Sequence, residues 1–192
     1  VMWGFNYSRP SLYALLSFPV EERTTEELEA ACLRLAQQAG TLRASVTEDE
    51  NGVFTLKDGY EAYFDAIPSA YARLGLDYPL FSRRTYAAKG VISSIGLSYA
   101  GISGIFIPHT GEPNVNIDQP ALLMLSSAAH ETAHYLGIAR EDEANFVSYL
   151  ACTYSDDPAI AYSGTMLALI HCGNKLYAAD KEKYAALYAT YT

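Results

Sequence analysis

The residues best suited to chemistry form the run His130-Glu131-Thr132-Ala133-His134, in which two histidines stand four positions apart. On an α-helix this spacing places both imidazoles on one face, where their nitrogens can reach one metal ion at about 2.0–2.1 Å. Glu131 is offset around the helix and can address a water bound to the metal. Zinc suits such a site, because a Zn²⁺ ion with imidazole and carboxylate ligands and one open position lowers the pKa of its bound water to about 7. The run therefore predicts a Zn²⁺ site with His130 and His134 as ligands and Glu131 as general base.

A five-residue motif of this kind also occurs by chance, so its surroundings matter. Apolar residues precede it (ALLMLSSAA) and follow it (YLG), which indicates a buried helix. Buried imidazoles and a buried carboxylate need partners, and a metal ion would supply one. The alternative is a metal-free helical hairpin.

A third candidate ligand follows at once, in the run Glu141-Asp142-Glu143-Ala144-Asn145 at the start of a second expected helix. Here the sequence resembles the gluzincin zinc peptidases, whose second helix carries an ExxxD or ExxA[DN] pattern. The resemblance implies that Glu141 binds zinc and that Asn145 accepts a hydrogen bond from the outer ring nitrogen of one motif histidine. Glu143 is an alternative ligand. A further alternative is that the acidic residues only complement the positive end of the helix.

The connection between the two expected helices is short, with six residues between His134 and Glu141. Most gluzincins have a longer one. The HExxHxxG spacing also resembles the metzincins, but their third ligand falls here at Arg140, which cannot bind a metal. We interpret Arg140 as a structural partner of the neighbouring acids. A tight reversal at Gly137, in the left-handed backbone conformation, would fold the second helix back onto the first.

Longer blocks extend the resemblance to one uncharacterised bacterial family, a domain of unknown function: WGFNYSRP, FIPHTGEPNVN, HETAHYLGIAREDEANFVSYLAC and YSGTMLALIHCGNKLY. The resemblance implies a membrane-anchored zinc metallopeptidase that acts on a peptide or protein outside the cytoplasm. It also implies that Val1 follows a removed anchor, so that this chain is soluble and meets the membrane only through that missing segment. The alternative is a non-catalytic metal-binding sensory or scaffold domain.

Weaker candidates lie on either side of the motif. Tyr162 and His171 are possible stabilisers of a transition-state oxyanion, but packing is the better explanation of Tyr162 and a helix end the better explanation of His171. Glu112, Asn114 and Asn116 are candidates to line a substrate cleft beside an edge strand. Turn chemistry alone also selects such residues.

Composition narrows the function classes. The chain has 192 residues, of which half are hydrophobic, and 13 basic against 22 acidic residues give a net charge of −9. This balance excludes a general nucleic-acid binder and electrostatic docking onto an anionic membrane. Cys32, Cys152 and Cys172 include no CxxC pair, which excludes a cysteine-based zinc ribbon and a disulfide-dense small scaffold. We interpret them as core residues, with a Cys152–Cys172 disulfide as the alternative in an oxidising compartment.

The rest of the sequence predicts one mainly α (α+β) domain over residues 1–192, a zincin-like helical domain with a small β-sheet. Residues 1–23 are expected to be irregular. The uncharged run 90–111 is interrupted by Gly and Pro, so we expect strand and loop there and no membrane span. Strands are expected around Ile102–Ile107, followed by a loop over 109–119.

Helix signals divide the remaining residues. The first expected helix runs from a Thr24–Glu27 capping box to Gly40, and the second begins at Asp58 with a bend or break at Pro68. The third covers 120–137, with Asp118 or Gln119 as its cap. The last three run from about Glu141 to before Asp157, over 159–177, and from about Asp180.

Overall fold

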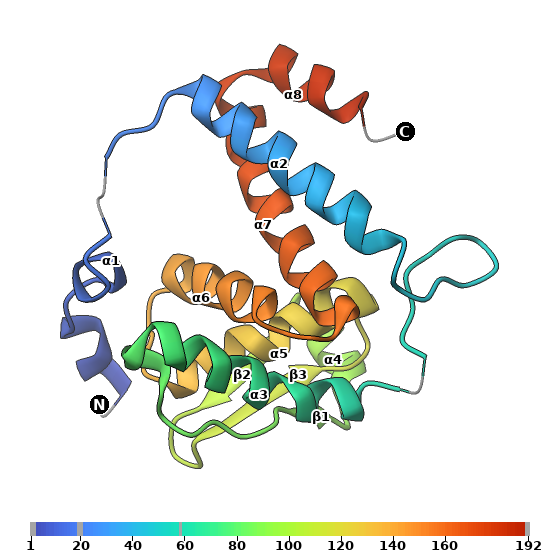
Figure 1. The fold of residues 1–192 in the computed structure, drawn as a ribbon. Helices are drawn as coiled ribbons and strands as arrows, with labels where there is room; N and C mark the ends of the chain where they lie inside the picture. The colour runs from blue at the N-terminus through green and yellow to red at the C-terminus, as the bar shows by residue number, and fades with distance from the viewer. Residues whose placement is uncertain (1–2, 19–20, 58, 191–192) are drawn as a thin grey trace.

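The computed structural model describes residues 3–18, 21–57 and 59–190 (Figure 1). It confirms the predicted fold class, since helices dominate and the strands form one small sheet. The α-helices are α1 (Leu12–Leu15), α2 (Thr25–Arg43), α3 (Glu61–Asp77), α4 (Ser94–Tyr99), α5 (Ala121–Tyr135), α6 (Glu141–Thr153), α7 (Pro158–Ala179) and α8 (Lys181–Tyr188). Short 3-10 helices cover Trp3–Ser8 and Pro79–Phe81. The strands are β1 (Lys89–Val91), β2 (Gly104–Ile107) and β3 (Glu112–Asn116).

The capping box places the start of α2 correctly. The Thr24 hydroxyl accepts from the Glu27 backbone N–H while the Glu27 carboxylate accepts from the Thr24 N–H, which completes the predicted capping box of α2. That helix continues past Gly40 to Arg43. The helix α3 runs through Pro68 without interruption, and Asp58, its expected start, lies outside the described residues.

The sheet has the order β1-β3-β2, with β1 parallel and β2 antiparallel to the central strand. The prediction of a loop over 109–119 is therefore wrong, because this segment contains β3. Its sequence, EPNVN, contains a proline and two asparagines, which are residue types depleted in strands. Val115 and Asn116 of this strand are nevertheless buried. The parallel ladder with β1 begins only at Asn114, so Pro113 lies outside it. The short helix α4 was also not expected within the run 90–111.

The helix α5 lies at the centre of the molecule and contacts α3, α6, α7, β2 and β3. Buried polar groups fix its backbone. The Tyr71 hydroxyl of α3 donates to the carbonyl of Ala129 at 2.7 Å. The N–H of Ser126 donates to the Ser163 hydroxyl of α7, and the Ser148 hydroxyl of α6 donates to the carbonyl of Ser126. Three neighbouring helices therefore hold α5 in place.

The expected caps of α5 are wrong. Pro120 is itself the N-cap residue, and no side chain caps the helix. The Gln119 side chain donates instead to the carbonyls of Ser103 and Asn116, and the Asp118 carbonyl accepts from Ser98. These residues tie the end of the sheet to its loops.

Two hydrophobic clusters hold the fold together. The larger one joins α3, α5, α6 and the sheet in the lower body of Figure 1. The smaller one contains Cys32, Leu169, Leu176 and Leu187 and joins α2, α7 and α8 in the upper arm. All three cysteines are free thiols, with Cys32 and Cys152 buried as predicted. Among the described helices, none combines the length and apolar character that crossing a membrane requires.

Candidate metal centre

Three side chains from the ends of α5 and α6 converge on one point. The Nε2 atoms of His130 and His134 lie 3.0 Å apart, and a Glu141 carboxylate oxygen lies 3.1 Å from His130 Nε2. The other Glu141 oxygen lies 3.5 Å from His134 Nε2. Ligand atoms of these three residues all fall within 4.8 Å of one another. Two nitrogens and a carboxylate oxygen are a donor set that suits zinc.

The outer nitrogens of both imidazoles have oxygen partners. His130 Nδ1 lies 2.9 Å from Asn145 Oδ1, and His134 Nδ1 lies 2.6 Å from the carbonyl oxygen of Ile138. Both oxygens accept, so each Nδ1 donates and each neutral imidazole carries its lone pair on Nε2. Two lone pairs and a carboxylate oxygen thus face each other, an arrangement that a shared cation stabilises.

The position of the cluster adds to this preference for a cation. The histidines lie in the last two turns of α5, near the negative end of the helix dipole. Burial, and then the neighbouring His134, lower the pKa of His130 below its ordinary value, which favours the unprotonated imidazole that a metal needs. The arrangement therefore fits a divalent metal.

The backbone between α5 and α6 explains how six residues suffice for the connection. Gly137 has a φ of +92°. The Gly137 N–H donates to the backbone carbonyl of His134, and the N–H of Ile138 donates to the carbonyl of Ala133. These two bonds form a Schellman motif. The reversal turns the Ile138 carbonyl toward His134 and brings Glu141, the first residue of α6, to the histidine pair.

Glu143 lies elsewhere. Its carboxylate accepts the backbone N–H of Leu12 at 2.8 Å, at the start of α1. It therefore anchors the N-terminal segment to α6, and the structure brings Glu141 rather than Glu143 to the histidines. The expectation that residues 1–23 are irregular is wrong in part, because Trp3–Ser8 and Leu12–Leu15 form short helices.

Glu131 is buried between α5 and the edge strand β2. Its side chain is only 4% exposed, and Oε2 has no hydrogen-bond partner among the described residues. Burial, and secondarily the charge of Glu141, raise the pKa of Glu131 to about 8, although a backbone hydrogen bond from Phe106 opposes the shift. A carboxylate in this environment gains from any proton or cation that reaches it.

A cavity of about 380 Å³ opens beside these residues. Its walls are the histidine pair, Glu131, Glu141 and the residues of β2 and the turn after it: Gly104, Ile105, Phe106 and Pro108. A β-carbon on Gly104 would lie 2.6 Å from Glu131 Oε1, so only glycine leaves room for the carboxylate here. The cavity can therefore admit a small group to the side of the cluster where Glu131 lies.

The weaker candidates lie away from this cavity. Neither Tyr162 nor His171 is among the described residues that line it. The Tyr162 hydroxyl accepts from Arg43 and its ring packs on Phe54, whereas His171 is exposed on α7. The packing interpretation of Tyr162 thus has direct support.

The polar residues of β3 have structural partners. Glu112 pairs with Lys89, and Asn114 donates to the carbonyl of Glu112. The buried Asn116 donates to Ser98 and to the carbonyl of Ile102. None of the three is among the described residues that line the cavity. The contacts of Glu112 and Asn116 tie β3 to β1, to α4 and to the loop before β2.

The prediction that Arg140 pairs with neighbouring acids is wrong. Among the ion pairs of the described residues none includes Arg140, which instead serves through its extended backbone as N-cap of α6.

Sequence reasoning missed Gly104, Phe106 and Ile138. Gly104 carried a usable signal, because a glycine inside a strand marks a close approach to other atoms. Phe106 and Ile138 act through backbone groups that any residue would supply, so their types carried no signal.

Comparisons with known proteins agree with the family resemblance and go no further. No curated protein and no solved structure matches the chain. A family model described as "Protein of unknown function (DUF3810)" matches residues 1–192. The chain therefore belongs to the DUF3810 family.

Proposed function

We propose that this protein is a zinc-dependent metallopeptidase in which His130, His134 and Glu141 hold the metal and Glu131 is the general base. The observation that carries the proposal is the convergence of two imidazole Nε2 atoms and a carboxylate within 4.8 Å, beside a cavity that also contains Glu131. The free Oε2 of Glu131, the oriented Nδ1 atoms and the cavity each support it independently.

A zinc ion held by these three residues would lower the pKa of a bound water and polarise a substrate carbonyl. The side chains of the protein divide the remaining work. Asn145 and the Ile138 carbonyl hold the imidazoles in the orientation that ligation needs. Glu131 accepts a proton from the attacking water at Oε2 and returns it to the leaving nitrogen.

The proposal is tested by metal analysis and peptide cleavage with wild type, Glu131→Gln and Glu50→Gln. Glu50 is an exposed acid far from the motif in sequence and makes the matched control. We expect stoichiometric zinc in all three proteins. Cleavage of a peptide library should fall by about 100-fold or more in Glu131→Gln only.

Wild type without stoichiometric zinc would contradict the metal site. Equal cleavage by wild type and Glu131→Gln would contradict the assigned base. Stoichiometric zinc without any peptide cleavage would instead identify a metal-binding sensory or scaffold domain.

We also propose, from the family resemblance alone, that the full-length protein is attached to a membrane and that this domain lies outside the cytoplasm. Fractionation of the tagged full-length protein, with protease added to intact cells, tests both statements. Recovery in the soluble cytoplasmic fraction would contradict them.

A further inference from the structure

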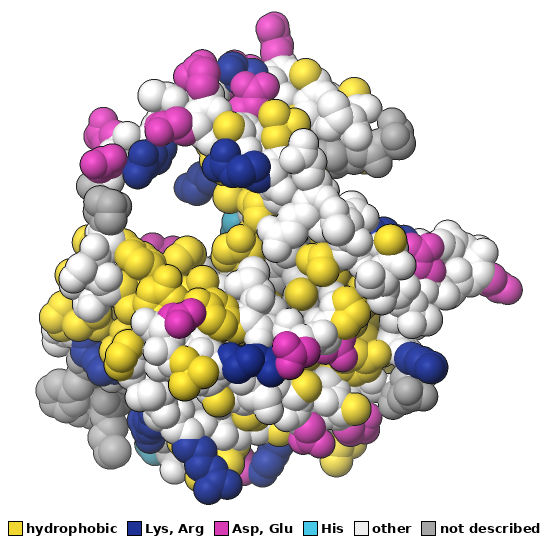
Figure 2. Space-filling model, in the orientation of Figure 1, with side chains coloured by type: hydrophobic (Ala, Val, Ile, Leu, Met, Phe, Trp, Pro, Cys, Tyr) yellow, Lys and Arg dark blue, Asp and Glu magenta, His cyan; other side chains and the backbone are white. Residues whose placement is uncertain are grey.

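A second concave surface lies on the far side of Asn145 from the histidines. It is a groove of about 720 Å³ between α2, α6 and α7, which we name the three-helix groove. Figure 2 shows the hollow between the upper arm and the lower body, with basic side chains along its upper margin and hydrophobic ones below. The proposed enzyme mechanism uses no residue of this groove except Asn145.

The lining has the pattern of an unfilled helix site. Apolar residues recur at helical spacing on the three walls, with Leu28, Ala31 and Leu35 on α2, Phe146 and Tyr149 on α6, and Ala168 and Cys172 on α7. Each helix thus turns one apolar stripe toward the same open space, as helices do around a missing fourth helix. Phe146 is 40% exposed, a large fraction for an apolar side chain of this size.

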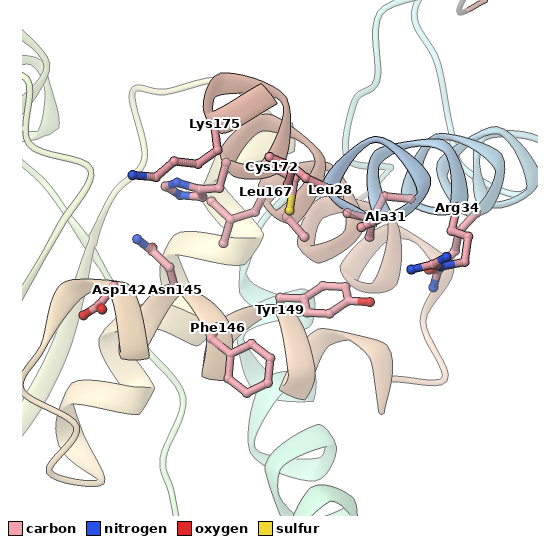
Figure 3. Close-up of a pocket in the computed structure, with 14 residues that line it drawn as sticks. Leu28, Ala31, Arg34, Asp142, Asn145, Phe146, Tyr149, Leu167, Cys172 and Lys175 are labelled. Atoms are coloured by element: carbon pink, nitrogen blue, oxygen red, sulfur yellow. The ribbon is translucent and has the colours of Figure 1, made fainter. Parts of the chain in front are cut away.

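The charges of the lining have the opposite sign to the molecule as a whole. The net charge of the chain is −9, yet the groove carries Arg34 and Lys175 and only one acid, Asp142. Within the described part of the chain, no ion pair or side-chain hydrogen bond involves Arg34 or Lys175. In Figure 3 these two cations extend from opposite sides of the groove, with the apolar side chains between them.

This charge pattern distinguishes between possible occupants. A lipid or fatty acid has one anionic head and would satisfy one cation. An amphipathic helix with acidic residues along its edges can meet both cations while its apolar face covers the stripes between them. We propose that the three-helix groove is a docking site for an acidic amphipathic helix of a partner protein.

Docking of this kind is independent of the proposed zinc chemistry. Among the described residues that line the groove, Asn145 is the one whose side chain contacts a histidine of the metal centre, through its Oδ1 and His130 Nδ1. Failure of the enzyme assay would therefore leave the docking proposal intact, and the reverse also holds.

The experiment uses the full chain as purified and a fluorescent designed helix of about 18 residues, ~27 Å long. Its leucines follow the first and fourth heptad positions and its edges carry glutamates. A second peptide has lysines in place of the glutamates. Fluorescence anisotropy measures the binding of each peptide to wild type, to Arg34→Glu/Lys175→Glu, and to Lys57→Glu/Arg84→Glu. The last variant makes the same change in net charge at exposed residues outside the groove.

We expect saturable binding of the acidic peptide to wild type, weakened when salt rises from about 50 to 500 mM. The groove variant should bind it about tenfold more weakly or worse, because two attractions become repulsions. The control variant should bind like wild type. Circular dichroism checks that all three proteins are folded.

Three results would overturn the proposal: no saturable binding of the acidic peptide to wild type, equal binding of the acidic and basic peptides, or equal losses in both variants. Saturable binding of oleate without binding of the acidic peptide would also overturn it and would identify a lipid site.

Discussion

At the scale of single residues, the candidate metal centre depends on atoms that are not themselves candidate ligands. Asn145 Oδ1 and the carbonyl of Ile138 each hold one imidazole by its Nδ1. Without them the rings could rotate or change tautomer, and the Nε2 lone pairs would no longer converge. The chemistry at this scale is therefore a matter of orientation as much as of ligand identity.

We predict that Asn145→Ala weakens zinc binding by about tenfold or more, because His130 loses the acceptor that fixes its ring. Asn145→Asp keeps an acceptor and should retain most of the affinity. Competition with a chromophoric chelator measures both values. Gln38→Ala, at another polar position of the groove wall, is the control, and an unchanged affinity in Asn145→Ala would refute the assigned role.

Glu131 makes stability depend on pH in the metal-free protein. Its pKa is about 8 in the fold against an ordinary 4.5. The folded state therefore binds this proton more tightly than the unfolded state. Its stabilising effect is complete below pH 4.5 and is lost as the pH rises through 8.

We compare the free energy of unfolding of Glu131→Gln with that of wild type, both in EDTA. We predict that the variant-minus-wild-type difference is about 3 kcal/mol more favourable to the variant at pH 8 than at pH 5. The glutamine cannot ionise, so it avoids the cost of a buried charge. Urea unfolding of both proteins at both pH values measures this difference. The contributions of the histidines cancel, because wild type and variant contain the same histidines. A difference that stays constant with pH, or one that Glu50→Gln reproduces, would show that Glu131 ionises normally.

At the scale of elements, the centre lies where α5 ends, α6 begins and β2 passes alongside. The Schellman motif at Gly137 sets the angle between the helices, and Gly104 allows the strand to approach Glu131 closely. Neither glycine contributes a functional group. Both matter because of where they allow the backbone to run.

We predict that Gly104→Ala retains zinc but lowers peptide cleavage by about tenfold or more, because its β-carbon would lie 2.6 Å from Glu131 Oε1 and 2.7 Å from Cγ. Gly96→Ala is the matched control, since a β-carbon there meets no atom within 4 Å. Steady-state kinetics and metal content measure the two effects. Cleavage at the wild-type rate by Gly104→Ala would show that the carboxylate position is not critical.

At the scale of the whole molecule, a bound metal would add a link between α5 and α6, which already meet through packing, the Ser148–Ser126 hydrogen bond and the His130–Asn145 hydrogen bond. Any ligand that binds only the folded state stabilises it by mass action. The exposed Glu141, the partly buried His130 and the buried His134 offer such a link only when the fold is intact.

We predict that zinc at 100 times its dissociation constant stabilises wild type by about 2.7 kcal/mol, seen as a rise in the thermal midpoint that a chelator reverses. His134→Ala should lose this rise. His171→Ala should keep it, because His171 lies on α7 outside the cluster. Equal rises in both variants would mean that zinc binds elsewhere.

Local signals in the sequence were enough for the helices and for the histidine pair. A capping box, a proline and a glycine act on their nearest neighbours, so the starts of α2 and α6, the reversal at Gly137 and the shared face of His130 and His134 can be read from spacing alone. Helix phase also placed Glu141 and Glu143 on roughly opposite faces of α6. It did not determine which of these faces meets the histidines.

Only the tertiary structure decided the rest. The strand β3 contains a proline and two asparagines, residue types that disfavour strands, and it forms because β1 and β2 pair with it beneath α5. The tie of Glu143 to Leu12, the closeness of Gly104 to Glu131 and the three-helix groove all join residues far apart in the chain. Such contacts depend on how whole elements pack, and no local run of residues records that packing.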